Sequence, residues 1–193
     1  MGRRKEFDEG VLQDKAMSLF WQNGFHKTTL ACLAREAGIK RGSLYNAYAN
    51  KENIFLEAFR KQTDSYLEEC KQSLQRSSLK SALRVFFRVA IQLMREGEPA
   101  HGCLTTRIIV EATEDMKEIK SCITTYLDAV EVELRNRFQQ AIDEGEFQGN
   151  PDRSAKLVIA VVRGMAVMER AYSDEKRLQE IADETLYLLL NTS

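Results

Sequence analysis

Apolar residues recur at helical spacing along almost the whole chain, and no stretch alternates apolar and polar residues as a half-buried strand does. Only two prolines, Pro99 and Pro151, interrupt this pattern in 193 residues. A hydrophobic content of 44% is enough for a buried core, which excludes a disordered or collagen-like chain. The sequence therefore predicts an all-α protein.

Nine helices are expected, without an internal repeat or a low-complexity linker. Asp8 and Asn50 are suitable N-cap residues, Thr28 or Thr29 can cap the second helix, and Gly24 is a C-terminal stop. The expected ranges are 7–24, 28–38, 41–48, 51–76, 79–96, 102–113, 117–145, 151–172 and 174–191. Gly97 and Pro99 are expected to stop the fifth helix.

The charge of the chain is unevenly distributed. Residues 1–51 hold nine Lys and Arg against five Asp and Glu, a net charge of +4, whereas residues 52–193 hold 19 against 24, a net charge of −5. A basic head on an acidic body concentrates the attraction for phosphate at one end of the chain. We expect a head that binds phosphate over 1–51 and a separate body over 52–193.

The four cysteines, Cys32, Cys70, Cys103 and Cys122, lie far apart and form no CxxC motif. No apolar run resembling a secretory signal precedes them, and no charge-free apolar segment reaches the length of a membrane span. These features favour free thiols in the cytoplasm and no membrane partner. No cofactor is expected, and zinc is disfavoured because only two histidines could supplement the thiols.

Two short helices joined by a turn that contains Gly38 are typical of a helix-turn-helix. In such a motif the second helix enters the major groove with its N-terminal residues on base edges, and arginine can hold guanine through two hydrogen bonds. Lys40 stands where Ser or Thr would cap this helix, and a cation there opposes the helix dipole unless phosphate is near. Lys51 also places a cation at a helix N-terminus, at the start of the next helix, and this combination indicates a phosphate site.

The run "GFHKTTLACLAREAGIKRGSLYNAYANKENIF" resembles the TetR family of bacterial transcriptional regulators. The matching residues are Gly24, Phe25, Thr28, Leu33, Ala34, Ala37, Gly38, Ile39, Gly42, Leu44, Tyr45, Tyr48, Lys51 and Glu52. The chain departs from the family at Lys40, often Ser or Thr, at Ala47, often His, and at Tyr48, often Phe.

This resemblance implies contacts from Thr28, Thr29, Tyr45 and Lys51 to phosphates, and from Arg41, Gly42, Ser43 and Asn46 to bases. Lys40 and Tyr48 complete the predicted DNA-binding set. Each residue taken alone could instead be an ordinary surface or half-buried side chain.

The last two helices are expected to form a homodimer. The segment "LVIAVVRGMAVM" is apolar around most of its circumference. In the last helix Leu178, Ile181, Ala182, Leu186 and Leu189 form one stripe, and Leu188 and Leu190 begin a second. A helix that is apolar on two faces needs two partners, so a four-helix bundle between two copies is predicted; the alternative is a monomer core.

The resemblance also implies a small-molecule inducer pocket among the middle helices. Residues 1–51 are therefore expected to form the DNA-binding domain, and residues 52–193 the ligand-binding and dimerisation domain. The candidate lining of the pocket is Phe86, Phe87, Ile91, Cys103, Thr106, Arg107, Tyr126, Met165 and Met168, although aromatic and Met residues at this spacing also suit a plain core. Arg107, if buried, needs an anion, which is either Glu111 on the next turn or a ligand.

The segment "HGCLTT" resembles an element of one TetR subgroup in which some members sense electrophiles or oxidants through a thiol. Cys103 near a helix N-terminus, with His101 close by, would have a lowered pKa; the alternative is a buried structural cysteine.

The function that follows is a ligand-responsive transcriptional regulator, a repressor that binds palindromic double-stranded DNA as a dimer and is released by a small molecule or by thiol modification. A DNA-bound regulator that acts through a protein partner is the second reading. An enzyme that uses Cys103 and His101 is disfavoured, because no orienting carboxylate, phosphate loop or metal pair accompanies them.

Overall fold

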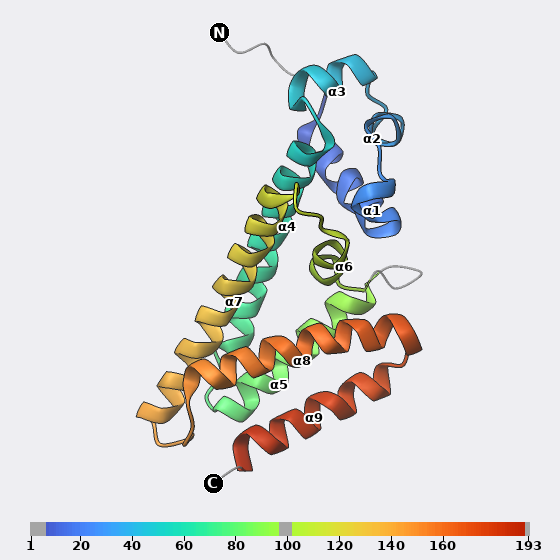
Figure 1. Cartoon of the computed structure of the whole chain (residues 1–193). Helices are drawn as coiled ribbons and strands as arrows, with labels where there is room; N and C mark the ends of the chain where they lie inside the picture. The colour runs from blue at the N-terminus through green and yellow to red at the C-terminus, as the bar shows by residue number, and fades with distance from the viewer. Residues whose placement is uncertain (1–6, 97–101, 192–193) are drawn as a thin grey trace. The chain divides into compact units, whose positions relative to one another are not determined.

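The structure is a computed structural model that describes residues 7–96 and 102–191. Within these ranges it consists of nine helices and no strands, as the sequence predicts (Figure 1). The helices are α1 (Glu9–Lys27), α2 (Leu30–Ala37), α3 (Arg41–Tyr48), α4 (Lys51–Leu74), α5 (Leu79–Arg95), α6 (Leu104–Glu111), α7 (Lys117–Asp143), α8 (Pro151–Tyr172) and α9 (Glu175–Asn191). The predicted stop at Gly97 and Pro99, and His101, lie outside the described residues.

Local capping explains where the first helices begin and end. The Asp8 carboxylate accepts the Val11 N–H at 3.1 Å, and the Thr29 hydroxyl accepts the Cys32 N–H at 3.2 Å, so Thr29 and not Thr28 caps α2. Gly38 ends α2 in the left-handed conformation, with φ of 67°. Asn50 caps α4 by accepting the Asn53 N–H at 2.8 Å.

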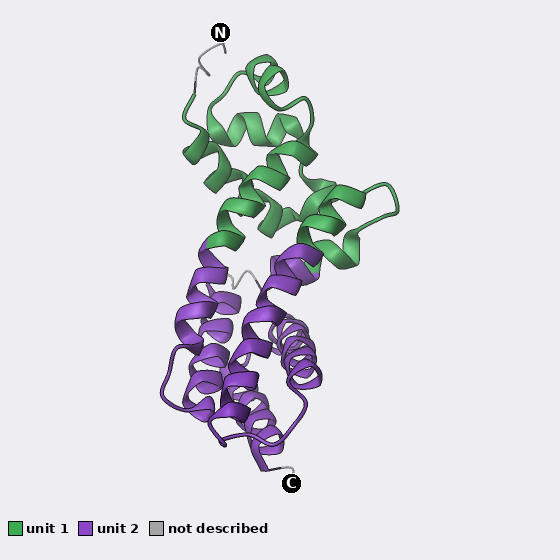
Figure 2. Ribbon diagram, turned by 90° about the vertical axis from the view of Figure 1, so that its left-hand side faces the viewer, with its two compact units in different colours: residues 1–64, 107–123 green, residues 65–106, 124–193 purple. Residues whose placement is uncertain are grey.

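The chain divides into two compact units (Figure 2). The first unit contains residues 1–64 and 107–123, and the second contains 65–106 and 124–193. The first unit is thus larger than the head expected from the sequence, because it includes the start of α4, most of α6 and the start of α7. Three helices, α4, α6 and α7, contribute residues to both units.

The core of the first unit is aromatic. Phe20 contacts Phe25 and Phe55 with ring centroids 5.8 and 5.1 Å apart, and Phe55 stacks on Phe59 at 5.3 Å. Leu33 of α2 and Leu44 of α3 are also fully buried. Burial of side chains from α1, α2, α3 and α4 fixes the helix-turn-helix on its neighbours.

The second unit packs α5, α8 and α9 against one another, around a core that also takes residues from α4 and α7. Leu178, Ala182, Leu186 and Leu189 of α9 are buried there, so this stripe packs inside the single chain. None of the described helices is both long enough and apolar enough to cross a membrane.

Candidate nucleic-acid interface

The start of α3 presents cations that nothing in the described chain neutralises. Lys40 is the N-cap residue, and its side chain makes no capping hydrogen bond. Lys40 and Arg41 are exposed, and among the described residues neither has a hydrogen-bond or ion-pair partner. A free helix N-terminus with two adjacent cations is suited to bind an anion such as phosphate.

The remaining groove-facing candidates lie beside them. Leu44 and Tyr48 are buried and anchor one side of α3, whereas Tyr45 is 60% exposed and Asn46 is exposed. Gly42 is exposed with no atom within 4 Å of where a Cβ would stand, and Ser43 is partly buried. Thr29 is exposed as well, although its hydroxyl already caps α2. The exposed face of α3 therefore combines hydrogen-bonding side chains with positive charge.

Two side chains of the predicted DNA-binding set are not accessible in this structure. Thr28 has no exposed surface, and its hydroxyl donates to the Gly24 carbonyl at 2.7 Å. Tyr48 is 3% exposed. The expectation of side-chain contacts from these two residues is therefore corrected: Thr28 holds the end of α1, and Tyr48 belongs to the core of the first unit.

Lys51 also has a different environment from the one expected. Its ammonium donates to the carbonyls of Phe25 (2.8 Å), His26 (3.3 Å) and Thr28 (3.0 Å), and it lies 4.4 Å from the centre of the Phe25 ring. An ammonium has three N–H groups, so all of them are used within the unit. Partial burial lowers the pKa of Lys51, and the nearby Glu111 carboxylate opposes this shift. In this structure the Lys51 ammonium holds the end of α1, and its expected phosphate contact stays a prediction.

In the second unit, Cys103 lies in a polar cluster with Arg163 and Thr105. Arg163 Nη1 donates to Cys103 Sγ at 2.9 Å and to Thr105 Oγ1 at 2.5 Å, and Cys103 Sγ and Thr105 Oγ1 are 2.9 Å apart. No carboxylate among the described residues forms an ion pair with Arg163, and its Nε is buried without a partner. The guanidinium is therefore available to stabilise a thiolate.

The environments of Cys70 and Cys103 shift the pKa values of the two thiols in opposite directions. Burial raises the pKa of the Cys70 thiol to about 11. Burial also raises that of Cys103, but the Arg163 charge and hydrogen bonds with Thr105 and Thr106 outweigh it, so the pKa of Cys103 is lowered overall. The sequence singled out Cys103, but it gave no signal for Arg163, which is 60 residues away along the chain.

The structure places the other predicted ligand-binding residues in several environments. A groove of about 540 Å³ between α5 and α9 is lined by Phe87 and Ile91, but by none of the other seven candidates. Phe86 and Met165 are buried core residues, and Tyr126 and Met168 pack against that core. Thr106 is partly buried beside Cys103, and burial raises the pKa of the Tyr126 hydroxyl.

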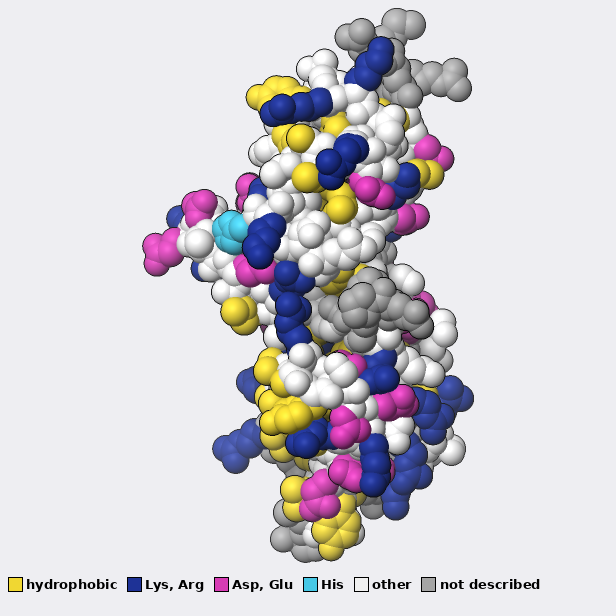
Figure 3. All heavy atoms as spheres, turned by 90° about the vertical axis from the view of Figure 1, so that its right-hand side faces the viewer, with side chains coloured by type: hydrophobic (Ala, Val, Ile, Leu, Met, Phe, Trp, Pro, Cys, Tyr) yellow, Lys and Arg dark blue, Asp and Glu magenta, His cyan; other side chains and the backbone are white. Residues whose placement is uncertain are grey.

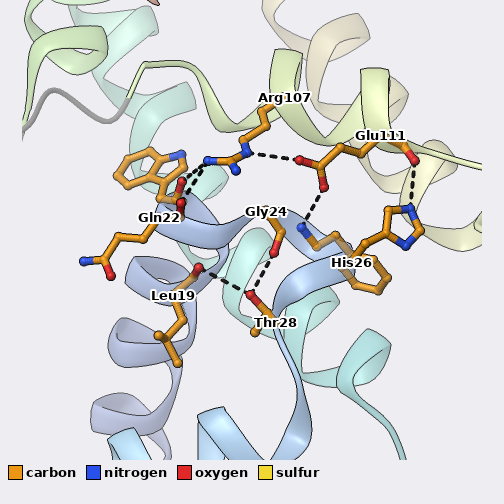
Figure 4. Close-up of polar contacts among 9 residues, drawn as sticks. Leu19, Gln22, Gly24, His26, Thr28, Arg107 and Glu111 are labelled. Carbon is orange, nitrogen blue, oxygen red and sulfur yellow. Dashed lines mark hydrogen bonds and ion pairs between the residues drawn. The ribbon is translucent and has the colours of Figure 1, made fainter.

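Arg107 is the clearest departure from the predicted ligand set. It belongs to the first unit and donates through Nε to Glu111 Oε1 at 3.1 Å and through Nη1 to the Trp21 and Gln22 carbonyls (Figure 4). Of the two anions considered from the sequence, Glu111 is thus the one that the structure supplies, and the ligand-binding assignment of Arg107 is corrected. The sequence could not indicate the contacts to α1, which are 85 and 86 residues away.

Two family models together cover most of the chain. Residues 12–58 match the model described as "Bacterial regulatory proteins, tetR family", and residues 80–184 match that of the "Tetracyclin repressor-like, C-terminal domain". The chain belongs to the TetR family. The resemblance carried by residues 24–55 is confirmed, and with it the assignment as a DNA-binding transcriptional regulator.

Individual members of the TetR family resemble the chain over nearly its full length. The HTH-type transcriptional repressor ComR of Escherichia coli (strain K12) is 28% identical over 191 residues, which covers 97% of this chain and 91% of ComR. A cysteine mutant of the TetR family transcriptional regulator CifR, complexed with 26-bp double-strand operator DNA, superposes with a TM-score of 0.87 at 21% identity, covering 97% of this chain and 100% of CifR. FadR from Bacillus subtilis in complex with stearoyl-CoA has a TM-score of 0.81 at 16% identity, covering 95% and 98%.

Proposed function

We propose that the chain is a cytoplasmic repressor that binds a palindromic operator as a homodimer through α3 and is released when Cys103 is modified or a small molecule binds. The observation that carries this proposal is the start of α3, where Lys40 and Arg41 are exposed and unpaired among the described residues. Arg41, Gly42, Ser43 and Asn46 would meet base edges, and Lys40, Thr29 and Tyr45 the phosphates.

Exposed apolar side chains on the last two helices support the dimer. Leu157 and Val167 of α8 are about half exposed, at 49% and 50%, and Tyr187 and Leu188 of α9 at 62% and 55%. Figure 3 shows hydrophobic side chains gathered along the lower left edge of the second unit. Packing these faces of two copies together would remove apolar surface from water and give an isologous contact.

The Cys103 cluster supports release through the thiol. Because the Arg163 guanidinium contacts the sulfur at 2.9 Å, it favours the thiolate, which is the nucleophilic form. Addition of the thiolate to the β-carbon of an α,β-unsaturated carbonyl compound would form an S–C bond and break the C=C π bond, with a proton from water taken up at the α-carbon. The adduct would remove the negative charge from the sulfur and insert bulk between Cys103 and Arg163. A catalytic thiol needs a general base and a carboxylate that orients it. The cluster of Cys103 with Arg163 and Thr105 contains neither, so we propose no catalytic activity for this thiol.

Selection of bound fragments from random double-stranded DNA by the reduced protein tests the DNA-binding part of the proposal. We expect a palindromic consensus whose half-sites lie one helical turn apart or a multiple of it, and binding that weakens steeply with salt. Enrichment of no sequence, or of one half-site alone, would contradict the dimer.

The same fragment then tests release. N-ethylmaleimide should dissociate the wild-type complex but leave a Cys103→Ser complex bound, while a Cys32→Ser/Cys122→Ser variant responds like the wild type. If Cys103→Ser protein is released as readily as wild type, the thiol route is wrong. Release by neither thiol reagents nor small molecules would favour a regulator that acts through a protein partner.

A further inference from the structure

Helix α1 is interrupted shortly before its end, and the interruption leaves backbone groups without helical partners. Gly24 has φ of 78° and ψ of 176°, far from helical values. An α-helix that stops leaves its last carbonyls free, and the segment that follows begins with free N–H groups. Such groups need partners from elsewhere in the structure.

Two residues of α6 supply partners on both sides of this interruption (Figure 4). Before it, Arg107 Nη1 donates to the Trp21 carbonyl at 2.5 Å and to the Gln22 carbonyl at 3.3 Å. After it, Glu111 Oε2 accepts the Phe25 N–H at 2.9 Å. The cation therefore meets carbonyls and the carboxylate meets an N–H, as the charges require.

The spacing and the fit of these side chains make the arrangement specific. Arg107 and Glu111 are four residues apart, so they lie on one face of α6, and Arg107 Nε donates to Glu111 Oε1 at 3.1 Å. A Cβ at Gly24 would collide with the Glu111 carboxylate, so the glycine is needed both for its backbone conformation and for the approach of this side chain. The His26 ring nitrogen Nε2 adds a contact to the Glu111 carbonyl oxygen at 2.9 Å.

The segment held in this way leads directly into the helix-turn-helix. The Phe25 ring packs against Phe20 and Phe55, and the Thr28 hydroxyl donates to the Gly24 carbonyl. The next residue, Thr29, caps α2. Any shift of the backbone at Phe25 is therefore passed to the start of α2, against which α3 packs.

We infer that Arg107 and Glu111 are positioning residues for DNA recognition, which fix the α2–α3 pair by holding the interrupted end of α1. This inference rests on the proposed function, because it assumes that α3 reads DNA.

The experiment compares wild type with Arg107→Ala and Glu111→Gln on the selected duplex, with folding of each variant checked by circular dichroism. The matched control is Gln139→Ala and Asp143→Asn, another pair four residues apart, which lies exposed on α7, away from the proposed dimer contact. We expect each α6 variant to bind DNA at least about tenfold more weakly, with the control unchanged. Amide hydrogen exchange gives the second measurement, and the Phe25 N–H should exchange faster in both α6 variants.

Each result decides the inference. Weaker binding together with faster exchange at Phe25 supports it. Wild-type affinity in both variants, or unchanged exchange at Phe25, overturns it while the proposed function stands. Failure of the wild type itself to bind any duplex identifies the proposed function, and not the α6 residues alone, as the error.

Discussion

Two helix ends of the first unit use cationic side chains in opposite ways. At the end of α1, Lys51 and Arg107 donate to backbone carbonyls, and Glu111 accepts a backbone N–H. At the start of α3, Lys40 and Arg41 have no such partners among the described residues. Cations at a helix C-terminus stabilise the fold, whereas cations at an N-terminus oppose it unless an external anion is present. Charge alone therefore does not identify a DNA contact; the hydrogen bonds already made by each cation do.

Gly24→Ala is expected to have the largest effect, because it disrupts the end of α1. The residue would carry a Cβ at positive φ and displace the Glu111 carboxylate, so the free energy of unfolding should fall by about 3 kcal/mol. Urea denaturation measures this change. Gly42→Ala in α3 is the control, because no atom lies within 4 Å of the added Cβ and its stability should stay equal or rise. Equal effects at both glycines would mean that α1 does not need the interruption.

Lys51→Met tests whether this lysine is a structural residue. The variant keeps most of the aliphatic chain but loses three hydrogen bonds to carbonyls, and we expect about 2 kcal/mol of destabilisation. Lys61→Met, on the same helix, removes only an exposed ion pair with Asp14 and should change stability by less than about 1 kcal/mol. A Lys51→Met protein of full stability that has simply lost DNA affinity would restore the phosphate contact expected from the sequence.

Lys40→Ser should change stability in the other direction. Serine can cap α3 and removes a cation from its N-terminus, so the protein should become more stable by about 1 kcal/mol. At the same time its DNA affinity should fall, with the salt dependence reduced by about one phosphate contact. Thermal unfolding and binding titrations at several salt concentrations give both values. Loss of stability would show that Lys40 serves the fold.

The smallest expected effect is on how the stability of the protein depends on pH. Hydrogen bonds with Arg107 and the Phe25 N–H outweigh burial, so the pKa of Glu111 is lowered in the folded state. The stability that this carboxylate contributes is therefore fully present above the ordinary glutamate pKa of about 4.3 and is lost as the pH falls through the folded value. Between pH 7 and pH 3.5, wild type should lose more stability than Glu111→Gln in denaturant titrations. An identical loss would mean that Glu111 titrates like a free glutamate.

The sequence predicted the helix boundaries well because the signals that set them are local. Asp8, Gly38 and Asn50 act within three or four residues of their own positions, and each has the capping role expected from the sequence. On α3 the local signal was used only in part: Leu44 and Tyr48 are four residues apart and both lie on the buried side, although Tyr48 was assigned to the DNA-binding set.

The roles of the charged residues could not be predicted where their partners are distant in sequence. Lys51 bonds to carbonyls 23 to 26 residues earlier, and backbone carbonyls leave no trace in a sequence pattern. Arg163 is separated from Cys103 by 60 residues. By contrast, the pairing of Arg107 with Glu111 was anticipated as one of two options, because a spacing of four residues is a local signal.

The central claim is that Arg41, left unpaired at the start of α3, reads bases. The most direct test measures the affinity of wild type and Arg41→Ala for the selected palindrome and for random duplex at one low salt concentration. We expect wild type to prefer the palindrome, and Arg41→Ala to lose about 1–3 kcal/mol of that preference while binding random DNA almost as before. An equal loss of affinity on both duplexes, or no binding by wild type, would contradict the account.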